Sequence, residues 1–597
     1  MNLEKSLKEN FGFSSFRKGQ QEIITQVLER KNTLGILPTG AGKSICYQLP
    51  AVLENGLTLV VSPLIALMKD QVDGLQEQGI SATFINSSLD YQEIEWRKEE
   101  ILRGEVKLLF LAPERFSLGE FNEFLQQLPI SLVAIDEAHC ISSWGHDFRP
   151  SYLDFAKILL AWESVPTILA LTATATKEVA SDICRTLGIE EKNIIQTGFE
   201  RKNLSFEVVK GKDKRSFVKE YLQLNKEESG IIYAGTRKEV DELEHFLSQS
   251  GFLATKYHAG LSEVERNRNQ EAFINDECHV MVATNAFGMG INKSNVRFVL
   301  HYQVPGNIES YYQEAGRAGR DGLESTAILL YSLQDFRLRS FFIEQSEVSE
   351  DRKTLEYEKL RAMQSYGNTQ GCLQRFILQY FGDDATDCGK CSNCLDDRES
   401  VDITIDTQKV LSNIKRMGER FGKTLVAKVL IGSKDQNVLK FRFEQLQTYG
   451  ILKNLTQKQA VELIDFLVSE GYIAIQKGQM PILLVSELGV RVLKGEEKVF
   501  RKMTVVKKTV VTQDEELAGL FEVLRSKRLE LAREQGVAPF LIFSDASLHD
   551  MANLLPETDE QFLEVKGVGQ NKLEKYGTIF MEEIKKFSEK AKGITES

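Results

Sequence analysis

The chain lacks any run of eighteen or more apolar residues, so we expect no membrane-spanning helix. It also lacks low-complexity tracts, and its polar N-terminus is typical of a helix start rather than of a secretion signal. Cysteine is scarce: four of the eight are clustered, and the others are scattered at Cys46, Cys140, Cys184 and Cys278. This distribution argues against a disulfide framework and favours a metal site in a reducing compartment, so we expect a cytoplasmic protein.

The chain also has fewer positively charged residues than negatively charged ones. The chain carries 74 lysines and arginines against 86 aspartates and glutamates, a formal net charge of −12. This balance argues against nonspecific coating of a nucleic-acid duplex, but it leaves room for a locally basic groove. Hydrophobic and charged contents of 42% and 27% are ordinary for a globular protein, and 597 residues predict about three to five domains.

One segment organises the N-terminal part: Leu37-Pro38-Thr39-Gly40-Ala41-Gly42-Lys43-Ser44. Apolar residues precede and follow it, which predicts a buried strand, a tight turn and a helix. Gly40 and Gly42 can adopt backbone angles that a Cβ disfavours, so that N–H groups and the helix N-terminus converge on phosphate. Lys43 would reach the outer phosphates of a nucleotide, and Ser44 would join the coordination of magnesium. The generic motif has glycine at position 37, and a chance turn is the alternative.

Apolar runs alternate with helical stretches over residues 1–200 and again over residues 201–340. The first series comprises residues 57–61, 106–111, 132–135 and 167–171, and the second comprises residues 230–233, 254–257, 280–284, 296–300 and 326–330. Continuous apolar runs separated by helices predict parallel sheets covered on both faces. We therefore expect a multidomain α/β protein with two parallel-sheet domains, whose ligands bind beyond the carboxyl ends of the strands.

The strand rhythm stops after residue 340, and smaller units follow. A charged helical stretch over 341–398 carries the cysteine cluster. The next unit, 399–500, mixes helices near 407–417 and 457–470 with short strands at 472–475 and 482–485. A basic run then predicts a linker over 501–513, and helical apolar spacing predicts a small all-α domain over 514–590.

Two acidic residues end one of the predicted buried strands, in the segment Asp136-Glu137-Ala138-His139. A carboxylate at this place can hold magnesium, which we assign to Asp136. Its neighbour Glu137 can orient or deprotonate an attacking water. An acidic strand cap is the alternative, and the phosphate-binding segment upstream favours catalysis.

Two arginines in the second domain complement this acidic pair. The segment from Gln313 to Arg320 places Arg317 and Arg320 three residues apart, which predicts that they share one helical face. A planar guanidinium matches the oxygens of a transferring γ-phosphate. The first domain offers no obvious arginine for this task. If the two arginines reach across a cleft, ATP hydrolysis requires domain closure, which is the action of a motor.

The clustered cysteines follow the spacing C-x15-C-x2-C-x2-C, at Cys372, Cys388, Cys391 and Cys394. Four thiolates make a closed tetrahedral site, so we predict structural zinc without a catalytic role. Cys140 lies beside the acidic pair without a thiolate partner, and we interpret it as a packing residue.

Taken together, these motifs resemble those of superfamily 2 helicases. Three further segments, residues 62–71, 140–150 and 286–293, are similar to those of the RecQ family, and the match extends from Phe11 to about Phe587. The resemblance implies two RecA-like lobes, a helical zinc-binding subdomain, a winged helix and an all-α HRDC domain. Relatives commonly have tyrosine at the position of Phe540, so the contribution of the HRDC domain to DNA binding stays open.

Several residue roles follow from the resemblance alone. Phe13, Arg17 and Gln20 match the adenine motif, in which Arg17 would stack on the base and Gln20 would bond its edge. Arg320 matches the arginine finger, with Gln313 and Arg317 as further γ-phosphate contacts. Tyrosine is frequent in bacterial relatives at the position of Phe13, and stacking survives that change.

The segment from Ser143 to Pro150 resembles the aromatic-rich loop of the family. Trp144 and Phe148 offer stacking faces, each worth about 1–3 kcal/mol per base, while His146 is a polar relay and Arg149 a phosphate ligand. His139 would couple this loop to the acidic pair. The alternatives are a core-anchoring Trp144 and a buried, satisfied His139.

The implied activity is an ATP- and magnesium-dependent DNA helicase that moves 3′ to 5′ and opens forks and recombination intermediates. Implied partners are single-stranded and forked DNA, a single-strand-binding protein and a topoisomerase, and we expect a monomer associated with the nucleoid. An RNA helicase of the Asp-Glu-Ala-His type is one alternative. A DNA-stimulated ATPase that anneals strands or scaffolds repair proteins is the other.

Overall fold

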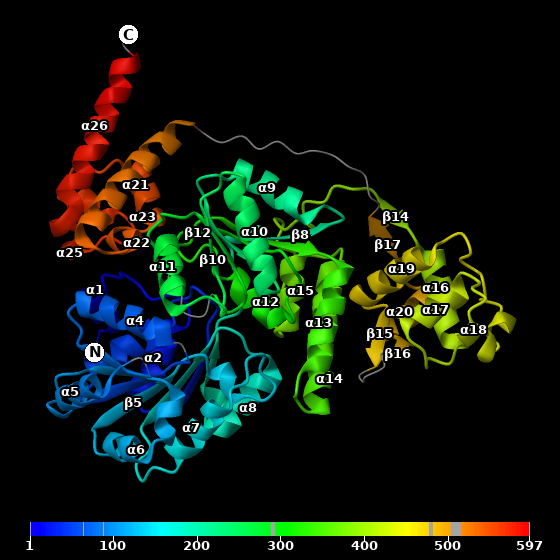
Figure 1. Ribbon diagram of the computed structural model, residues 1–597, viewed down its shortest axis with the longest axis horizontal. Coiled ribbons are helices and arrows are strands. Elements are labelled where there is room, and N and C mark those ends of the chain that lie inside the picture. Colours follow the sequence, from blue (N-terminus) through cyan, green and yellow to red (C-terminus); the bar gives the residue numbers. More distant parts are fainter. Residues whose placement is uncertain are drawn as a thin grey trace.

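The computed structural model describes residues 2–63, 65–87, 89–287, 293–476, 482–502 and 515–595. Two parallel-sheet lobes form the centre, with the winged helix on one side and the C-terminal helical bundle on the other (Figure 1). Positions 288–292 of the RecQ-like segment 286–293 and residues 503–513 of the expected linker lie outside these ranges. Within them, no helix is both long and apolar enough to cross a membrane.

Lobe 1 is built on seven strands in the order β3-β4-β2-β5-β6-β1-β7, all paired in parallel. The strands are β1 (Thr33–Ile36), β2 (Leu57–Val61), β3 (Ala82–Ile85), β4 (Leu108–Leu111), β5 (Ile130–Ile135), β6 (Thr167–Thr172) and β7 (Ile194–Gln196). Their helices are α1 (Leu3–Phe11), α2 (Gln20–Leu28), α3 (Ile45–Leu53), α4 (Ile65–Glu77), α5 (Tyr91–Leu102), α6 (Gly119–Gln126), α7 (Pro150–Leu160) and α8 (Lys177–Leu187). The central strands are buried along their length, as their continuous apolar runs predicted.

Lobe 2 repeats the architecture with six parallel strands in the order β10-β11-β9-β12-β13-β8. They are β8 (Leu204–Lys210), β9 (Ser229–Tyr233), β10 (Ala254–Tyr257), β11 (Val280–Ala283), β12 (Val296–His301) and β13 (Ser325–Tyr331). Its helices are α9 (Lys214–Leu224), α10 (Arg237–Gln249), α11 (Glu263–Ile274), α12 (Ile308–Ala315) and α13 (Leu333–Gln345). Helix α13 runs through residue 340, where the sequence analysis placed the boundary between the second domain and the next unit.

The zinc-binding subdomain and the winged helix follow lobe 2 in the chain. The subdomain lies against lobe 2, and the winged helix forms one side of the molecule (Figure 1). The subdomain contains α14 (Glu350–Asn368) and α15 (Leu373–Tyr380). The winged helix contains β14 (Ser400–Asp402), α16 (Thr404–Arg416), α17 (Lys423–Leu430), α18 (Gln436–Lys440), α19 (Gln457–Ser469), β15 (Ile473–Gln476), β16 (Ile482–Val485), α20 (Glu487–Lys494) and β17 (Phe500–Lys502). Strands β15 and β16 pair antiparallel as the predicted wing. Arg501 and Lys502, predicted as linker, instead lie in β17 and pair with β14.

The C-terminal bundle is helical, as predicted. It contains α21 (Glu515–Gln535), α22 (Pro539–Ile542), α23 (Asp545–Leu554), α24 (Asp559–Glu564), α25 (Gln570–Lys572) and α26 (Thr578–Thr595). The bundle rests on lobe 2, where the Arg525 guanidinium donates to the Glu227 carbonyl at 3.3 Å. Arg528, which is 1% exposed, bonds Asp545 at 2.8 Å and lies 3.9 Å from Asp276 of lobe 2.

Candidate active site

The phosphate-binding segment lies in the loop between β1 and α3. Gly40 and Gly42 have φ angles of 83° and 76°, the left-handed region that their prediction required. The Gln20 amide donates to the carbonyls of Ala41 and Gly42 at 3.0 and 2.9 Å. A Cβ on Gly42 would approach the Gln20 amide nitrogen to 2.7 Å, so this contact requires glycine.

The adenine-motif residues therefore hold the loop itself. Gln20 is buried, and its amide oxygen accepts from the Arg17 backbone N–H at 2.8 Å. The Arg17 guanidinium donates to the Gly40 carbonyl. Phe13 is 47% exposed, so its ring is available for stacking. The structure thus links the predicted base-binding residues to the shape of the phosphate loop.

Asp136 and Glu137 follow β5, and their carboxylates lie near the Lys43 ammonium. Burial and the neighbouring Glu137 charge raise the pKa of Asp136 to about 6, against the opposing effect of Lys43. Burial also disfavours the Glu137 carboxylate. The His139 hydrogen bond and Lys43 outweigh it, so that the pKa of Glu137 lies well below its usual range. Glu137 is therefore ionised, as a group that orients or deprotonates water must be.

His139 joins this pair to the aromatic-rich loop. Its buried ring lies 3.0 Å from the Thr172 hydroxyl and 3.3 Å from the Glu137 carboxylate. The ring also stacks on His146, with centroids 4.4 Å apart. Burial, His139 and Lys359 hold the pKa of His146 well below its usual range, so His146 is neutral. His139 is thus both satisfied and placed between the loop and the carboxylates.

The two arginines do not share a helical face, and that prediction was wrong. Helix α12 ends at Ala315, and Arg317 and Arg320 lie in the turns that follow. Gly319 has a φ of 64°, which ends helical continuation. We name residues 316–320 the arginine turn. The arginine turn packs close to the phosphate loop: a Cβ added to Gly40 would be 3.7 Å from the Arg320 Cα.

Burial, together with the charges of Arg317 and Arg201, lowers the pKa of Arg320 to about 9. This crowding of three guanidinium groups makes the surroundings of the phosphate loop electropositive. A concentration of positive charge of this kind favours a polyanion. The predicted γ-phosphate contact Gln313 instead donates to the Thr174 hydroxyl of lobe 1 at 2.9 Å, so it bridges the lobes directly.

The aromatic-rich loop is a loop, as predicted, and Trp144 is 53% exposed. This exposure excludes the core-anchor alternative. Ser143 is also exposed, while Phe148 is half-buried. Arg149, the predicted phosphate ligand, donates to the Asp147 carboxylate at 2.9 and 3.1 Å. DNA phosphate would therefore have to compete with Asp147 for this guanidinium.

The four clustered cysteines lie together at one end of α15. Their sulfurs are all within 4.8 Å of one another, with 3.9 Å from Cys391 to Cys372 and 4.0 Å from Cys388 to Cys394. A tetrahedral zinc ion with Zn–S bonds of about 2.3 Å places sulfurs about 3.8 Å apart. Backbone N–H groups of Leu373, Arg375, Cys388 and Cys391 donate to the sulfurs, which favours thiolates. The donor set and its spacing therefore fit zinc.

Cys140, interpreted as a packing residue, is buried. Its sulfur lies 3.8 Å from both the His139 ring and the Asp147 carboxylate. Asp147 is already bound by Arg149. This trio therefore packs the base of the aromatic-rich loop.

Sequence reasoning missed Arg201, which lies where lobe 1 meets lobe 2. Its guanidinium donates to the Thr39 carbonyl of the phosphate loop at 2.7 Å. It also donates to the carbonyls of Gly316, Ala318 and Gly319 in the arginine turn, at 3.0–3.2 Å. An isolated arginine outside any motif carries no local signal for this role.

Five family models match the chain. They are DEAD/DEAH box helicase over residues 17–183, Helicase conserved C-terminal domain over 213–322, RecQ zinc-binding over 333–395, RQC domain over 397–510 and HRDC domain over 518–584. The "ATP-dependent DNA helicase RecQ" of Bacillus subtilis is 52% identical over 97% of each chain. Proteins with the same name from Haemophilus influenzae and Pasteurella multocida are 38% and 39% identical over 96% of this chain and 94% and 92% of theirs. The chain belongs to the RecQ family of helicases.

Proposed function

We propose that this protein is an ATP-dependent DNA helicase that moves 3′ to 5′ along single strands and opens forks and recombination intermediates. The observation that carries the proposal is the arginine turn of lobe 2 lying against the phosphate loop of lobe 1. Nucleotide bound between the lobes would contact both, so its hydrolysis would change how the lobes meet. The bacterial relatives are named as DNA helicases, which supports DNA as the polynucleotide.

ATP would lie between the adenine motif and the arginine turn. Phe13 and Arg17 would stack on the base, and Gln20 would bond its edge while holding the loop. The backbone of Thr39, Gly40 and Gly42 would cradle the phosphates, with Lys43 on the outer ones. Arg320, Arg317 and Gln313 would then stabilise the charge that develops on the γ-phosphate.

Magnesium fits this site by the chemistry of its donors. Ser44 and Asp136 would hold the ion, since hydroxyl and carboxylate oxygens are ligands that it prefers. The elevated pKa of the crowded Asp136 carboxyl marks a place where a cation would relieve charge repulsion. Bound magnesium would neutralise charge on the phosphate oxygens, while Glu137 orients the attacking water.

Replacement of Glu137 by glutamine should retain ATP binding and lower turnover by about 10²–10⁴-fold, the usual contribution of general base catalysis. The amide keeps the shape of the side chain but cannot accept a proton. Steady-state hydrolysis and fluorescent-nucleotide binding measure the two effects. Near-normal hydrolysis would remove Glu137 from this role.

Replacement of Trp144 by alanine should reduce the stimulation of ATP turnover by single-stranded DNA by about tenfold, because a stacking contact of about 1–3 kcal/mol is lost. The ratio of turnover with DNA to turnover without it measures the effect. Replacement of the exposed Trp96, far from the loop in sequence, is the matched control. Unchanged stimulation and unwinding would contradict a DNA-sensing role.

The finer assignments belong to the same proposal. We place lobe 1 at 1–200, lobe 2 at 201–340, the zinc-binding subdomain at 341–398 and the HRDC domain at 514–590. The winged helix, predicted at 399–500, is extended to 502 to include β17, which shortens the predicted linker of 501–513 to 503–513. Ser143, Trp144, His146, Phe148 and Arg149 would contact DNA. A monomer near the nucleoid, working with a single-strand-binding protein and a topoisomerase, is proposed from the family resemblance.

A fork-unwinding assay with labelled 3′ and 5′ tails tests the function. Unwinding of a DNA fork that requires the 3′ tail is the expected result. Preference for a matched RNA fork would favour an RNA helicase. ATP hydrolysis that DNA stimulates without any strand separation would favour an annealing or scaffolding ATPase.

A further inference from the structure

Helix α14 of the zinc-binding subdomain reaches back to the aromatic-rich loop of lobe 1. The Lys359 ammonium donates to the Trp144 carbonyl at 2.9 Å. The Arg352 guanidinium donates to the carbonyls of Ser143 and Gly145, the latter at 3.1 Å. Three consecutive backbone carbonyls are thus bound by two cations from one helix. These contacts hold the backbone of the loop and leave the Trp144 ring free for a base.

Lys359 and Glu309 form a buried ion pair. The Lys359 side chain is 6% exposed, and it lies 3.4 Å from the carboxylate of Glu309, which is 5% exposed. Removing one partner of a buried ion pair leaves an uncompensated charge, so the pair resists separation. Arg352 is anchored as well, because its guanidinium lies 2.8 Å from Glu356 one turn along the helix.

Glu309 connects Lys359 to α12, the helix that precedes the arginine turn. It lies in the first turn of α12, and Gln313 lies four residues later on the same face. Gln313 bonds Thr174 of lobe 1 and also hydrogen-bonds His146 of the aromatic-rich loop. The loop is therefore connected to α12 at two points one turn apart, directly through His146 and Gln313 and indirectly through Lys359 and Glu309. Helix α12 in turn leads directly into the arginine turn.

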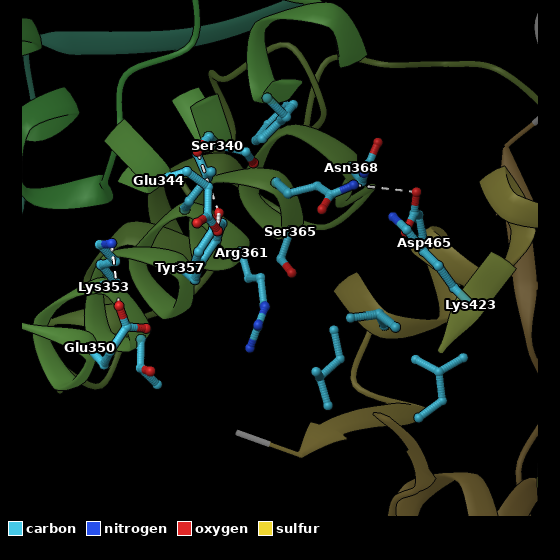
Figure 2. Close-up of a pocket in the computed structure, with 17 residues that line it drawn as sticks. Ser340, Glu344, Glu350, Lys353, Tyr357, Arg361, Ser365, Asn368, Lys423 and Asp465 are labelled. Carbon is cyan, nitrogen blue, oxygen red and sulfur yellow. Dashed lines mark hydrogen bonds and ion pairs between the residues drawn. The ribbon is translucent and has the colours of Figure 1, made fainter. Parts of the chain in front are cut away.

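Another face of α14 meets the winged helix across a cleft of 530 Å³ (Figure 2). Lys353, Tyr357 and Arg361 line this cleft from α14, with Arg361 extending into it, while Lys423 and Asp465 line it from the winged helix (Figure 2). The two sides touch where the Gln364 amide donates to the Asp465 carboxylate at 3.4 Å. One helix thus contacts the loop, α12 and the winged helix.

We propose that Lys359 is a positioning residue that ties the Trp144 backbone to α12, so that a base stacked on the loop shifts the arginine turn. The proposal rests on the proposed function. Lys359 is almost fully buried, and its partners within the described residues are the Trp144 carbonyl and Glu309 rather than a predicted nucleotide-binding residue, so it acts through these two. Displacement of the loop either moves α12 with it or breaks a buried ion pair. Arg352 holds the loop backbone on both sides of Trp144, through the carbonyls of Ser143 and Gly145.

The test replaces Lys359 by methionine in the full-length, zinc-loaded chain and measures ATP turnover against the concentration of an oligothymidylate. Maximal stimulation by DNA should fall at least about fivefold, the lower end of ordinary coupling between sites. The oligothymidylate concentration at half-maximal stimulation should stay within about twofold, because the stacking rings remain. Lys359→Arg, which keeps a cation in reach of both partners, should retain most of the stimulation.

Lys353→Met is the matched control, because it makes the same chemical change on the cleft face of α14. The double variant Lys359→Met with Glu309→Gln removes the unpaired carboxylate, and it should fold normally while staying uncoupled. Parental stimulation in this double variant would overturn the proposal, as would a loss explained wholly by weaker DNA binding. If DNA fails to stimulate ATP turnover by the parent enzyme, the proposed function is refuted, and the positioning role of Lys359 is refuted with it.

Discussion

Replacement of Arg320 by alanine is expected to lower ATP turnover by about 10³–10⁵-fold, the usual contribution of an arginine finger. A Cβ on Gly40 of the phosphate loop would lie 3.7 Å from the Arg320 Cα, and the charges of Arg317 and Arg201 are close to the Arg320 guanidinium. Their mutual repulsion is relieved when a polyanion enters, so the guanidinium is aimed at charge that develops during hydrolysis. Steady-state hydrolysis with saturating DNA measures the loss.

Two further variants sharpen this test. Arg320→Lys keeps the charge but not the planar fork, so it should recover only part of the activity. Fluorescent-nucleotide binding to Arg320→Ala should weaken far less than turnover falls, because the loop and Lys43 remain. Equal losses in binding and turnover would mean that Arg320 serves the ground state instead.

Loss of the zinc centre is the second large effect. Structural zinc contributes an apparent free energy of about 10–16 kcal/mol, which exceeds the stability of many whole domains. Replacement of the fully buried Cys391 by serine should therefore abolish stoichiometric zinc and unfold α15 with its surroundings. Metal analysis should find one zinc per parent chain and much less in the variant, and limited proteolysis should cut the variant near residues 373–395.

Cys278→Ser provides the control, since Cys278 is half-buried and lies outside the cluster. It should keep both the zinc and the resistance to proteolysis. A freshly purified parent without zinc would overturn the cysteine argument. Unfolding of the subdomain should also spread to lobe 1, because Asp383 accepts hydrogen bonds from the Phe199 N–H and the Gln196 amide at 2.7 and 3.0 Å.

The central strands of both sheets could be predicted because burial on both faces leaves a continuous apolar run. The edge strands β7 and β8 were not predicted, because they are not buried on both faces. Each has partly exposed positions, so its sequence alternates or shortens and loses that signal. Strand β3 has only four residues, too few for periodicity to separate it from a buried helical turn.

The site residues could be predicted where chemistry fixes their spacing. The phosphate loop and the cysteines have such spacing, and both came together as expected. The position of Arg317 and Arg320 was predicted wrongly, because the prediction continued helical spacing past Ala315 although glycine follows there and the helix ends. The contact between Lys359 and Trp144 spans 215 positions, and no local pattern specifies a contact between a side chain and a distant carbonyl.

Arg201 suggests where the two lobes part. Three of its four carbonyl partners belong to the arginine turn and one belongs to the phosphate loop. If the lobes separate, we expect the guanidinium to keep its three bonds to the arginine turn and to lose the bond to the Thr39 carbonyl. Arg201 would then move with lobe 2, and its bond to Thr39 would report whether the lobes are closed.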